Sequence, residues 1–313
     1  MMRGSKALAV AVRNPAGEII VHTEPLDARI YGGRLARMPF LRGLTLLWDA
    51  LGLGIKSLMF SADVAIAEEA EAQDAAKPGQ AATKPSSAFE GPAQIGTVIL
   101  SLSFSIFLFF VIPAFVAGLA DRWLNLGSTQ IVSNLIEGMV RLGLLIGYIW
   151  IISFIPDIKR LYGYHGAEHK TINAYEDKAR LTPDVVARYS LEHPRCGTAF
   201  LLTVVILSIL IYTLLPPMSL GIRILSRIAL LPLIAGMGYE FLRFTAARQH
   251  NAFIRLITKP NLALQRLTTR EPDAQMLEVA IAALDHVLAY ETGQQQVAAP
   301  VLLAEVPVGK AAS

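Results

Sequence analysis

The sequence predicts a mainly α-helical integral membrane protein with about four transmembrane helices. Apolar residues make up 53% of its 313 residues, which is more than a soluble domain needs. The excess is concentrated in discrete runs, and two of these runs carry no charge and exceed the ~20 residues that span hydrocarbon. Most Lys and Arg residues lie outside these runs, as expected for loops on one side of a membrane.

The N-terminal segment, residues 1–43, is expected to be cytosolic and to contain a β-hairpin. Ala7–Val12 and Glu18–His22 are β-prone runs. The intervening Asn14–Gly17 is typical of a turn, because its Pro presets one backbone angle and its Gly permits a positive one. Met1–Arg13 lacks a long apolar core, so no cleavable signal peptide is expected.

Residues 44–67 are predicted to form an amphipathic helix at the membrane interface. Asp49, Lys56 and Asp63 interrupt this apolar stretch at nearly two-turn intervals and would form one polar stripe. A fifth transmembrane helix is the alternative. Residues 68–92 change to Ala, Glu, Gln, Pro, Ser and Lys, a composition that predicts a disordered linker.

Residues 93–242 are predicted to form the four-helix transmembrane domain. Ile95–Ala120 and Cys196–Ile222 contain no charged residue. Gly138–Pro156 and Leu220–Tyr239 carry arginines near one end, where long side chains can reach the headgroups.

An even number of spans places the N-terminal region, the loop 157–197 and the C-terminal region on one side. All but four of the 28 Lys and Arg residues lie there; the exceptions are Arg122, Arg141, Arg223 and Arg227. The positive-inside tendency makes that side the cytosol. We therefore expect a multi-pass inner-membrane protein with cytosolic termini, cytosolic helices in residues 243–292 and a disordered tail in residues 293–313.

The mild net charge of +3 is explained by membrane orientation and contact with anionic lipids, so membrane lipids are expected partners and nucleic acid is not. Protein partners and oligomeric state stay open. A single cysteine rules out an internal disulfide. Cys196 is therefore a buried small residue, a metal ligand or a reactive thiol.

Three of the six histidines lie within residues 165–193, in the predicted cytosolic loop. If residues 165–169 are helical, His165 and His169 share a face. Neutral imidazole and thiolate are preferred zinc ligands, so these two residues, His193 and Cys196 could fill a tetrahedral site. The sequence therefore predicts a divalent-metal cofactor, with zinc as the expected ion.

In a catalytic version of this site, one coordination position of the metal would stay open for water. His165 and His169 would bind the metal and Glu168 would act as general base, in the order of the motif H-x-x-E-H. The topology favours Glu240, at the cytosolic end of the fourth span, as a further ligand. The other candidates for that position are His193, Glu176 and Glu192.

Two other interpretations of these residues stay open. Tyr164, His165 and His169 could be amphipathic anchors at the headgroup level, with Cys196 packed at the start of a span. A helix N-terminus near Gly197 would lower the pKa of Cys196, so a cysteine hydrolase that uses Cys196 with a nearby His is a competing mechanism.

A second polar cluster is predicted at the opposite membrane face. Glu137 and Arg141 are four residues apart near the start of one span, as Arg223 and Arg227 are in another. Glu137 could pair with one arginine, and the remaining cations could bind an anionic headgroup or phosphate. Snorkelling combined with helix-packing ion pairs is the simpler interpretation.

Five segments resemble the bacterial YqhQ-like membrane protein family, which has no known function and is described as a predicted metal-dependent enzyme family. They are Met1–Arg3, Arg42–Asp63, Tyr164–Lys170, His193–Thr198 and Leu267–Pro272. The resemblance implies a membrane protein whose metal dependence rests on the same histidines. The family usually has a Gly-rich stretch ending in Glu-Gly-Val before Met1, so the true start lies upstream or this stretch is dispensable.

The leading functional hypothesis is a zinc-dependent hydrolase that acts on a membrane-associated substrate. The first alternative is a non-enzymatic membrane scaffold whose His and Cys cluster holds a structural metal or only packs. The second is a small-solute transporter, which would use the cluster around Glu137.

Overall fold

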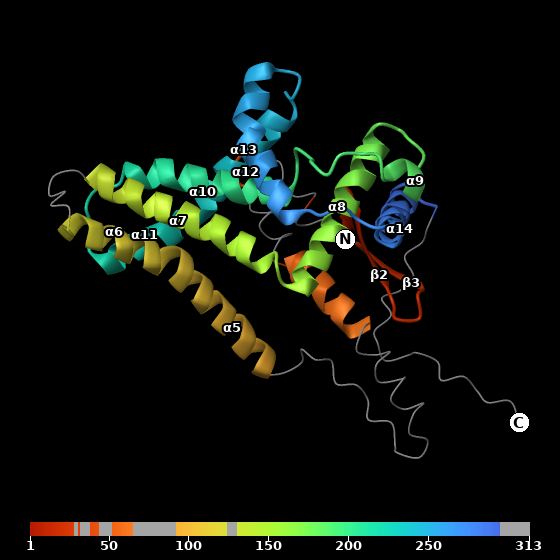
Figure 1. Ribbon diagram of the computed structural model, residues 1–313, viewed down its shortest axis with the longest axis horizontal. Coiled ribbons are helices and arrows are strands. Elements are labelled where there is room, and N and C mark those ends of the chain that lie inside the picture. The colour runs from red at the N-terminus through yellow and green to blue at the C-terminus, as the bar shows by residue number, and fades with distance from the viewer. Residues whose placement is uncertain (28–30, 32–37, 44–51, 65–91, 124–129, 295–313) are drawn as a thin grey trace, which may run out of the picture.

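The computed structural model describes residues 1–27, 31, 38–43, 52–64, 92–123 and 130–294 (Figure 1). The predicted mainly helical class is confirmed, and one small sheet accompanies the helices. In Figure 1 the long apolar helices lie on one side of the molecule, and the sheet lies on the other with the last helix of the described chain.

The predicted N-terminal hairpin is confirmed and gains a third strand. β1 (Met2–Arg3), β2 (Ala7–Arg13) and β3 (Ile19–Pro25) form an antiparallel sheet in the order β1-β2-β3. The β2–β3 register runs from Ala7 opposite Pro25 to Arg13 opposite Ile19. In the turn between them Gly17 adopts a φ of +92°, a conformation that glycine takes without steric cost.

α14 (Ala274–Glu291) covers one face of this sheet. Its Leu277 and Leu284 are buried in a core that includes Met2 and Ala9 of the strands. The Asp273 carboxylate caps the helix by accepting a hydrogen bond from the Met276 amide at 2.8 Å, which stabilises such a helix by about 1 kcal/mol.

The first predicted span forms one continuous helical rod in three parts. α5 (Pro92–Ile106) is followed by one π-helical turn, η2 (Phe107–Val111), and by α6 (Ile112–Trp123). Pro113 has no amide hydrogen to donate to the Phe109 carbonyl, four residues earlier. The Arg141 Nε donates to that carbonyl instead, at 2.9 Å.

The other predicted spans correspond to four helices. These are α7 (Gln130–Ile152), α10 (Gly197–Thr213), α11 (Leu220–Ala229) and α12 (Leu231–Ala246). In the described chain, two helical segments are long and apolar enough to cross a membrane: Gly96–Trp123 and Gln130–Ile152. α11 and α12, bent by 42° at their junction, would make a third span if they cross together.

Four spans are therefore not confirmed, and prolines explain two of the differences in bounds. α10 ends at Thr213, after 17 residues, because Pro216 and Pro217 follow. Leu230 separates α11 from α12 next to Pro232. α7 begins at Gln130 and not at Gly138, so Glu137 and Arg141 lie inside it.

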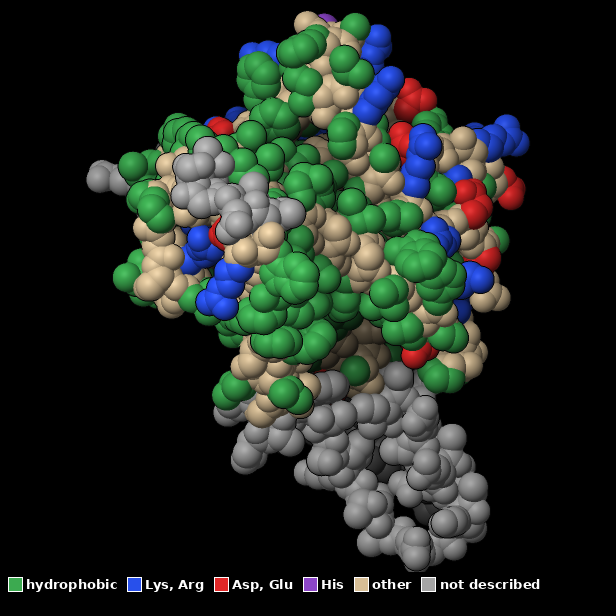
Figure 2. All heavy atoms as spheres, turned by 60° about the vertical axis from the view of Figure 1, so that its left-hand side comes forward, with side chains coloured by type: hydrophobic (Ala, Val, Ile, Leu, Met, Phe, Trp, Pro, Cys, Tyr) green, Lys and Arg blue, Asp and Glu red, His purple; other side chains and the backbone are tan. Residues whose placement is uncertain are grey.

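Apolar side chains cover much of the outer surface of these helices. Figure 2 shows hydrophobic side chains gathered over the face that comes forward from the left of Figure 1. Among the large exposed apolar residues are Phe104, Phe107, Phe115, Trp123 and Leu225. Such a surface suits contact with lipid tails.

Three further helices connect or flank the bundle: α8 (Pro156–Glu176), α9 (Pro183–Val186) and α13 (Ala252–Thr268). Residues 54–64 are also helical, within the predicted interfacial helix. Residues 44–51 and 65–67 of that prediction, the linker up to residue 91 and residues 295–313 of the tail lie outside the described residues.

Candidate metal centre

The histidine motif lies in the middle of α8 and is helical, as the metal hypothesis requires. His165 and His169 are one turn apart on the same face, and their ring centroids are 4.4 Å apart. Pro156 in the first turn suits the helix start, because proline has no amide hydrogen that would need a partner there.

α8 approaches its neighbours closely through small residues. Ala167 and Ala174 are fully buried in the core shared with α14. At Gly166, a Cβ atom would lie 2.2 Å from the carbonyl oxygen of Arg270. Glycine thus permits the chain between α13 and α14 to lie directly on α8, where the Arg270 amide donates to the Tyr162 carbonyl at 2.9 Å.

Backbone carbonyls fix the orientation of both imidazoles. His165 Nδ1 lies 2.8 Å from the Thr268 carbonyl oxygen, and His169 Nδ1 lies 2.5 Å from the Leu191 carbonyl oxygen. A carbonyl only accepts, so each Nδ1 carries the hydrogen, and the lone pair of each neutral ring is on Nε2. Metal-binding histidines typically make this second hydrogen bond.

Cys196 brings its sulfur to these two rings from the start of α10. It is the N-cap residue, and its Sγ accepts from the Thr198 amide at 3.4 Å. The Sγ lies 3.3 Å from His165 Nε2, and one donor atom each from His165, His169 and Cys196 lie within 4.8 Å of one another. Zinc bonds of the usual lengths would place neighbouring ligand atoms about 3.5 Å apart, so the three residues fit.

The same contacts set the protonation of the metal-free site. Burial opposes ionisation of Cys196, but hydrogen bonds and charge from His165 and His169 outweigh it and lower the thiol pKa to about 5. Burial likewise disfavours the charged form of His165, but its contacts with Cys196 raise the imidazole pKa to about 9. A thiolate and an imidazolium therefore face each other at neutral pH.

The segment that leads into Cys196 is fastened to α8 by two polar side chains. Lys170 Nζ donates to the Ala187 and Tyr189 carbonyls at 2.7 and 2.9 Å. Asn173 Nδ2 donates to the Ser190 and Glu192 carbonyls at 2.9 and 3.1 Å. Together with His169, they place one face of α8 against the backbone of residues 187–192.

His193 lies beside the three-donor group, and its backbone is held by Gln265. The Gln265 amide accepts from His193 N at 2.9 Å and donates to His193 O at 2.8 Å. The His193 ring is 5.9 Å from that of His169. Its buried Nε2 makes no hydrogen bond among the described residues but lies 3.5 Å from a carboxylate oxygen of Glu176. Burial and the charge of His169 lower its pKa.

The carboxylates considered as ligands have other contacts. The Glu240 carboxylate receives two hydrogen bonds from Arg42 and one from the Phe40 amide, so it does not join the three-donor group. Glu192 pairs with Arg266 at 2.8 Å, and Glu176 pairs with Arg195. Glu168 is outside that group as well, but its charge contributes to the raised pKa of His165.

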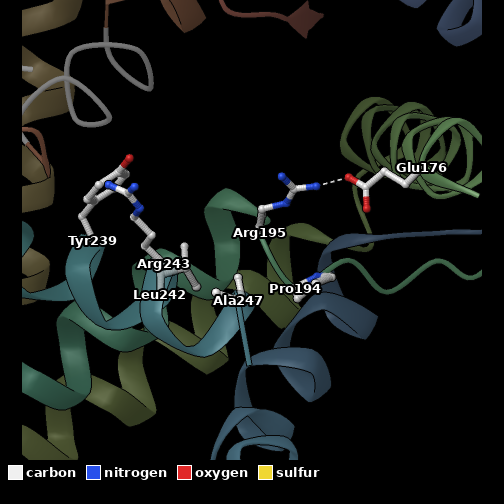
Figure 3. A pocket seen from close by; sticks show the side chains of 8 residues that line it. Glu176, Pro194, Arg195, Tyr239, Leu242, Arg243 and Ala247 are labelled. Atoms are coloured by element: carbon white, nitrogen blue, oxygen red, sulfur yellow. Dashed lines mark hydrogen bonds and ion pairs between the residues drawn. The ribbon is translucent and has the colours of Figure 1, made fainter. Parts of the chain in front are cut away.

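A pocket of about 400 Å³ adjoins this site (Figure 3). Pro194 and Arg195, from the segment between His193 and Cys196, form one wall, and α12 forms another with Leu242 and Arg243. Figure 3 shows the Arg195 side chain directed at Glu176 and the Arg243 side chain directed toward Tyr239. The pocket thus combines an apolar wall with two arginines, one of which is paired with the lining carboxylate of Glu176.

Sequence reasoning missed the residues that orient the ligands. Thr268 and Leu191 act through backbone carbonyls, which leave no side-chain signal in a sequence. Gln265 is fully buried, and an amide inside an otherwise amphipathic helix is a weak signal that could have indicated a buried partner. The predicted second cluster is brought together, with Glu137 contacting Arg141, Arg223 and Arg227.

Comparisons with known proteins agree with the resemblance seen in the motifs. The sequence model of the family described as "Protein of unknown function (DUF1385)" matches residues 38–290. "Uncharacterized protein YqhQ" of Bacillus subtilis (strain 168) is 34% identical over 296 residues, which cover 95% of this chain and 91% of that protein. No solved structure matches. The matched region contains all three residues of the donor group.

Proposed function

The chain belongs to the DUF1385 family of proteins of unknown function, and we propose that it is a multi-pass bacterial inner-membrane protein with a zinc-type centre at its cytosolic face. One observation supports the metal most directly. The Nε2 atom of His165 lies 3.3 Å from the Cys196 sulfur, and His169 offers a ring nitrogen to the same group, while both Nδ1 atoms are fixed on backbone carbonyls. Three protein ligands are typical of a catalytic zinc site, which keeps a fourth position for water or substrate.

We propose hydrolysis of a membrane-associated substrate as the reaction. A zinc ion would supply a Lewis acid and would lower the pKa of a water molecule. Glu168, on the same helix turn as both histidines, would take the proton from that water. The pocket beside Pro194 and Arg195 would admit the substrate. Its apolar wall suits an amphiphile, and Arg243, the lining arginine that is not paired with Glu176, suits a negatively charged group on it.

Elemental analysis of the detergent-purified protein tests the metal. We expect about one zinc per chain, because the three donor atoms are already in place. A His165→Ala/His169→Ala variant should lose the metal while it stays folded. His250→Ala is the matched control, since His250 is exposed and remote from the motif in sequence. A folded wild-type protein that takes up no transition metal, even after reconstitution, contradicts the proposal.

Cobalt substitution separates a catalytic centre from a structural one. An open position should let a small anion change the visible spectrum of the cobalt form, whereas a position filled by His193 should leave the spectrum unchanged. Glu168→Gln should keep the metal and the spectrum but abolish hydrolysis in a screen of peptide, lipid and phosphoester substrates. Loss of metal in this variant would make Glu168 a ligand and not a base.

A thiol hydrolase is the second candidate, favoured by the 3.3 Å contact between Cys196 Sγ and His165 Nε2. In that mechanism Cys196 is the nucleophile and His165 its proton partner. Activity that survives metal removal but is lost on alkylation of Cys196, the single cysteine of the chain, would support the thiol and contradict the zinc mechanism.

A further inference from the structure

A cluster of charged side chains is buried between α7 and α11, far from the metal centre. Glu137, Arg141, Arg223 and Arg227 have relative exposures of 1%, 4%, 9% and 2%. One Glu137 oxygen lies 2.7 Å from Arg141 Nη2 and 3.3 Å from Arg227 Nε, and its other oxygen lies 4.0 Å from Arg223 Nη1. Three guanidinium groups thus share one carboxylate.

The helices around this cluster cannot neutralise it. Residues 93–155 and 197–239 contain four arginines, no lysine and two carboxylates, which leaves an excess of two positive charges. The second carboxylate, Asp121, accepts a hydrogen bond from Ser133. Arginine does not lose its proton in proteins, so rearrangement of these side chains cannot remove the excess.

One arginine also has an unused donor in the interior. Arg227 Nη2 donates to Asn134 Oδ1 at 2.9 Å, but the buried Nη1 has no hydrogen-bond partner among the described residues. The Arg223 side chain has only its 4.0 Å pairing with Glu137 in the described part of the chain. Burying the charged Arg227 Nη1 donor without an acceptor is strongly unfavourable, so an acceptor from outside the protein is expected.

Aromatic contacts and backbone hydrogen bonds hold the guanidinium groups in place. The Tyr212 ring lies 4.5 Å from the Arg227 guanidinium carbon and 5.3 Å from that of Arg141. The Tyr212 hydroxyl donates to the Arg227 carbonyl at 2.7 Å, and Arg141 also donates to the Phe109 carbonyl. A prearranged set of guanidinium forks is the arrangement that binds phosphate oxygens best.

We propose that this cluster binds the phosphate group of a ligand, with Arg223 and Arg227 as its main contacts. A phosphate monoester carries close to two negative charges at neutral pH and would balance the excess charge. The group could come from a lipid headgroup or from a soluble phosphate. Tyr212 and Cys196 are at opposite ends of α10, about 24 Å apart along the helix, so this site is independent of the metal centre.

Phosphate analysis of the full-length protein tests the proposal. After purification in detergent and phosphate-free buffer, bound lipids are extracted and identified by mass spectrometry, and the delipidated protein is titrated with radiolabelled orthophosphate and with phosphatidic acid in mixed micelles. Arg223→Gln and Arg227→Gln remove one charge each. Arg122→Gln is the matched control, because Arg122 is exposed and outside the cluster.

We expect each cluster variant to weaken phosphate binding at least about tenfold, while the control binds like the wild type. Retention of lipid alone would identify a headgroup as the source, and orthophosphate binding would identify a soluble phosphate. If Arg227→Gln does not fold, Arg223→Gln decides, because its single 4.0 Å pairing contributes little to folding. The proposal is overturned if folded wild-type protein binds neither form, or if the control loses as much affinity as the cluster variants.

Discussion

Cys196 combines two influences that stabilise a thiolate. It caps the positive end of the α10 dipole, and it lies against the imidazole of His165. Each influence comes from a different part of the chain, since α10 supplies the first and α8 the second. The metal-free protein should therefore hold a thiolate next to an imidazolium at neutral pH.

The Cys196 thiolate predicts that the ultraviolet absorbance of the protein depends on pH. In chelator-treated protein, the ultraviolet thiolate absorbance of Cys196 should disappear as pH falls through about 5. The pairing of the Cys196 thiolate with the His165 imidazolium therefore stabilises the fold between about pH 5 and 9. That stability is lost as pH falls through about 5, where the lowered pKa of Cys196 protonates the thiolate, and as pH rises through about 9, where His165 loses its proton. Cys196→Ala is the control for other chromophores. A midpoint near 9 would show that the histidines do not stabilise the thiolate.

Sequence predicted part of the site at this scale and could not predict the rest. The spacing of His165 and His169 implied a shared helix face, and the ligand preference of zinc indicated Cys196 as one of four possible donors. Glu240 was favoured because its expected place near the membrane surface was topologically suitable. Its actual partner is Arg42, and no local pattern indicates a pairing between residues so far apart in sequence.

At the scale of elements, the site depends on how closely α8 meets the segment between α13 and α14. Gly166 makes this contact possible, and hydrogen bonds from His165 and from Arg270 N hold the segment in place. The segment therefore has little freedom to move away from a larger side chain.

Gly166→Ala should lower the free energy of unfolding by about 1–3 kcal/mol, because its Cβ would overlap a fixed backbone oxygen. Thermal unfolding in detergent measures this, and zinc affinity should fall as well. Gly147→Ala in α7 is the matched control, since a Cβ there has no neighbouring atom within 4 Å. Equal stability of the two variants would show that the chain between α13 and α14 moves aside to accommodate the added methyl group.

Element types were easier to predict than their bounds. The hairpin follows from turn residues and β-prone runs, which are local signals. The helix of the histidine motif was only a condition of the metal hypothesis, and α8 occupies much of the segment 157–197 that was expected to be a loop. The transmembrane spans were predicted from runs of apolar residues, and such runs do not stop where a helix ends. Pro216, Pro217 and Pro232 end or break helices inside largely apolar runs. The predicted span Cys196–Ile222 therefore extended past the end of α10, and the predicted span Leu220–Tyr239 crossed the break between α11 and α12.

At the scale of the whole molecule, α14 joins the two ends of the described chain. It packs on the N-terminal sheet and on α8, and Glu291 accepts hydrogen bonds from Ser5. The sheet, the motif helix and the last helix thus share one core.

Leu277→Ala tests how far this shared core stabilises the protein. Leu277 is 1% exposed, and its truncation should lower the free energy of unfolding by about 2–5 kcal/mol. Limited proteolysis should show faster cleavage in the sheet and in α8 together. Leu256→Ala, at a residue 58% exposed, is the control and should cleave like the wild type. Selective cleavage of α14 alone would contradict a shared core.

The position of α14 in the chain also determines when the N-terminal sheet can be covered during synthesis. The strands emerge from the ribosome first, but the helix that covers them begins at Ala274. At roughly 5–20 residues per second, the sheet waits for about 10–50 s with an apolar face uncovered. A nascent chain arrested before Ala274 would thus leave this face of the sheet open to chaperones and proteases until α14 is made.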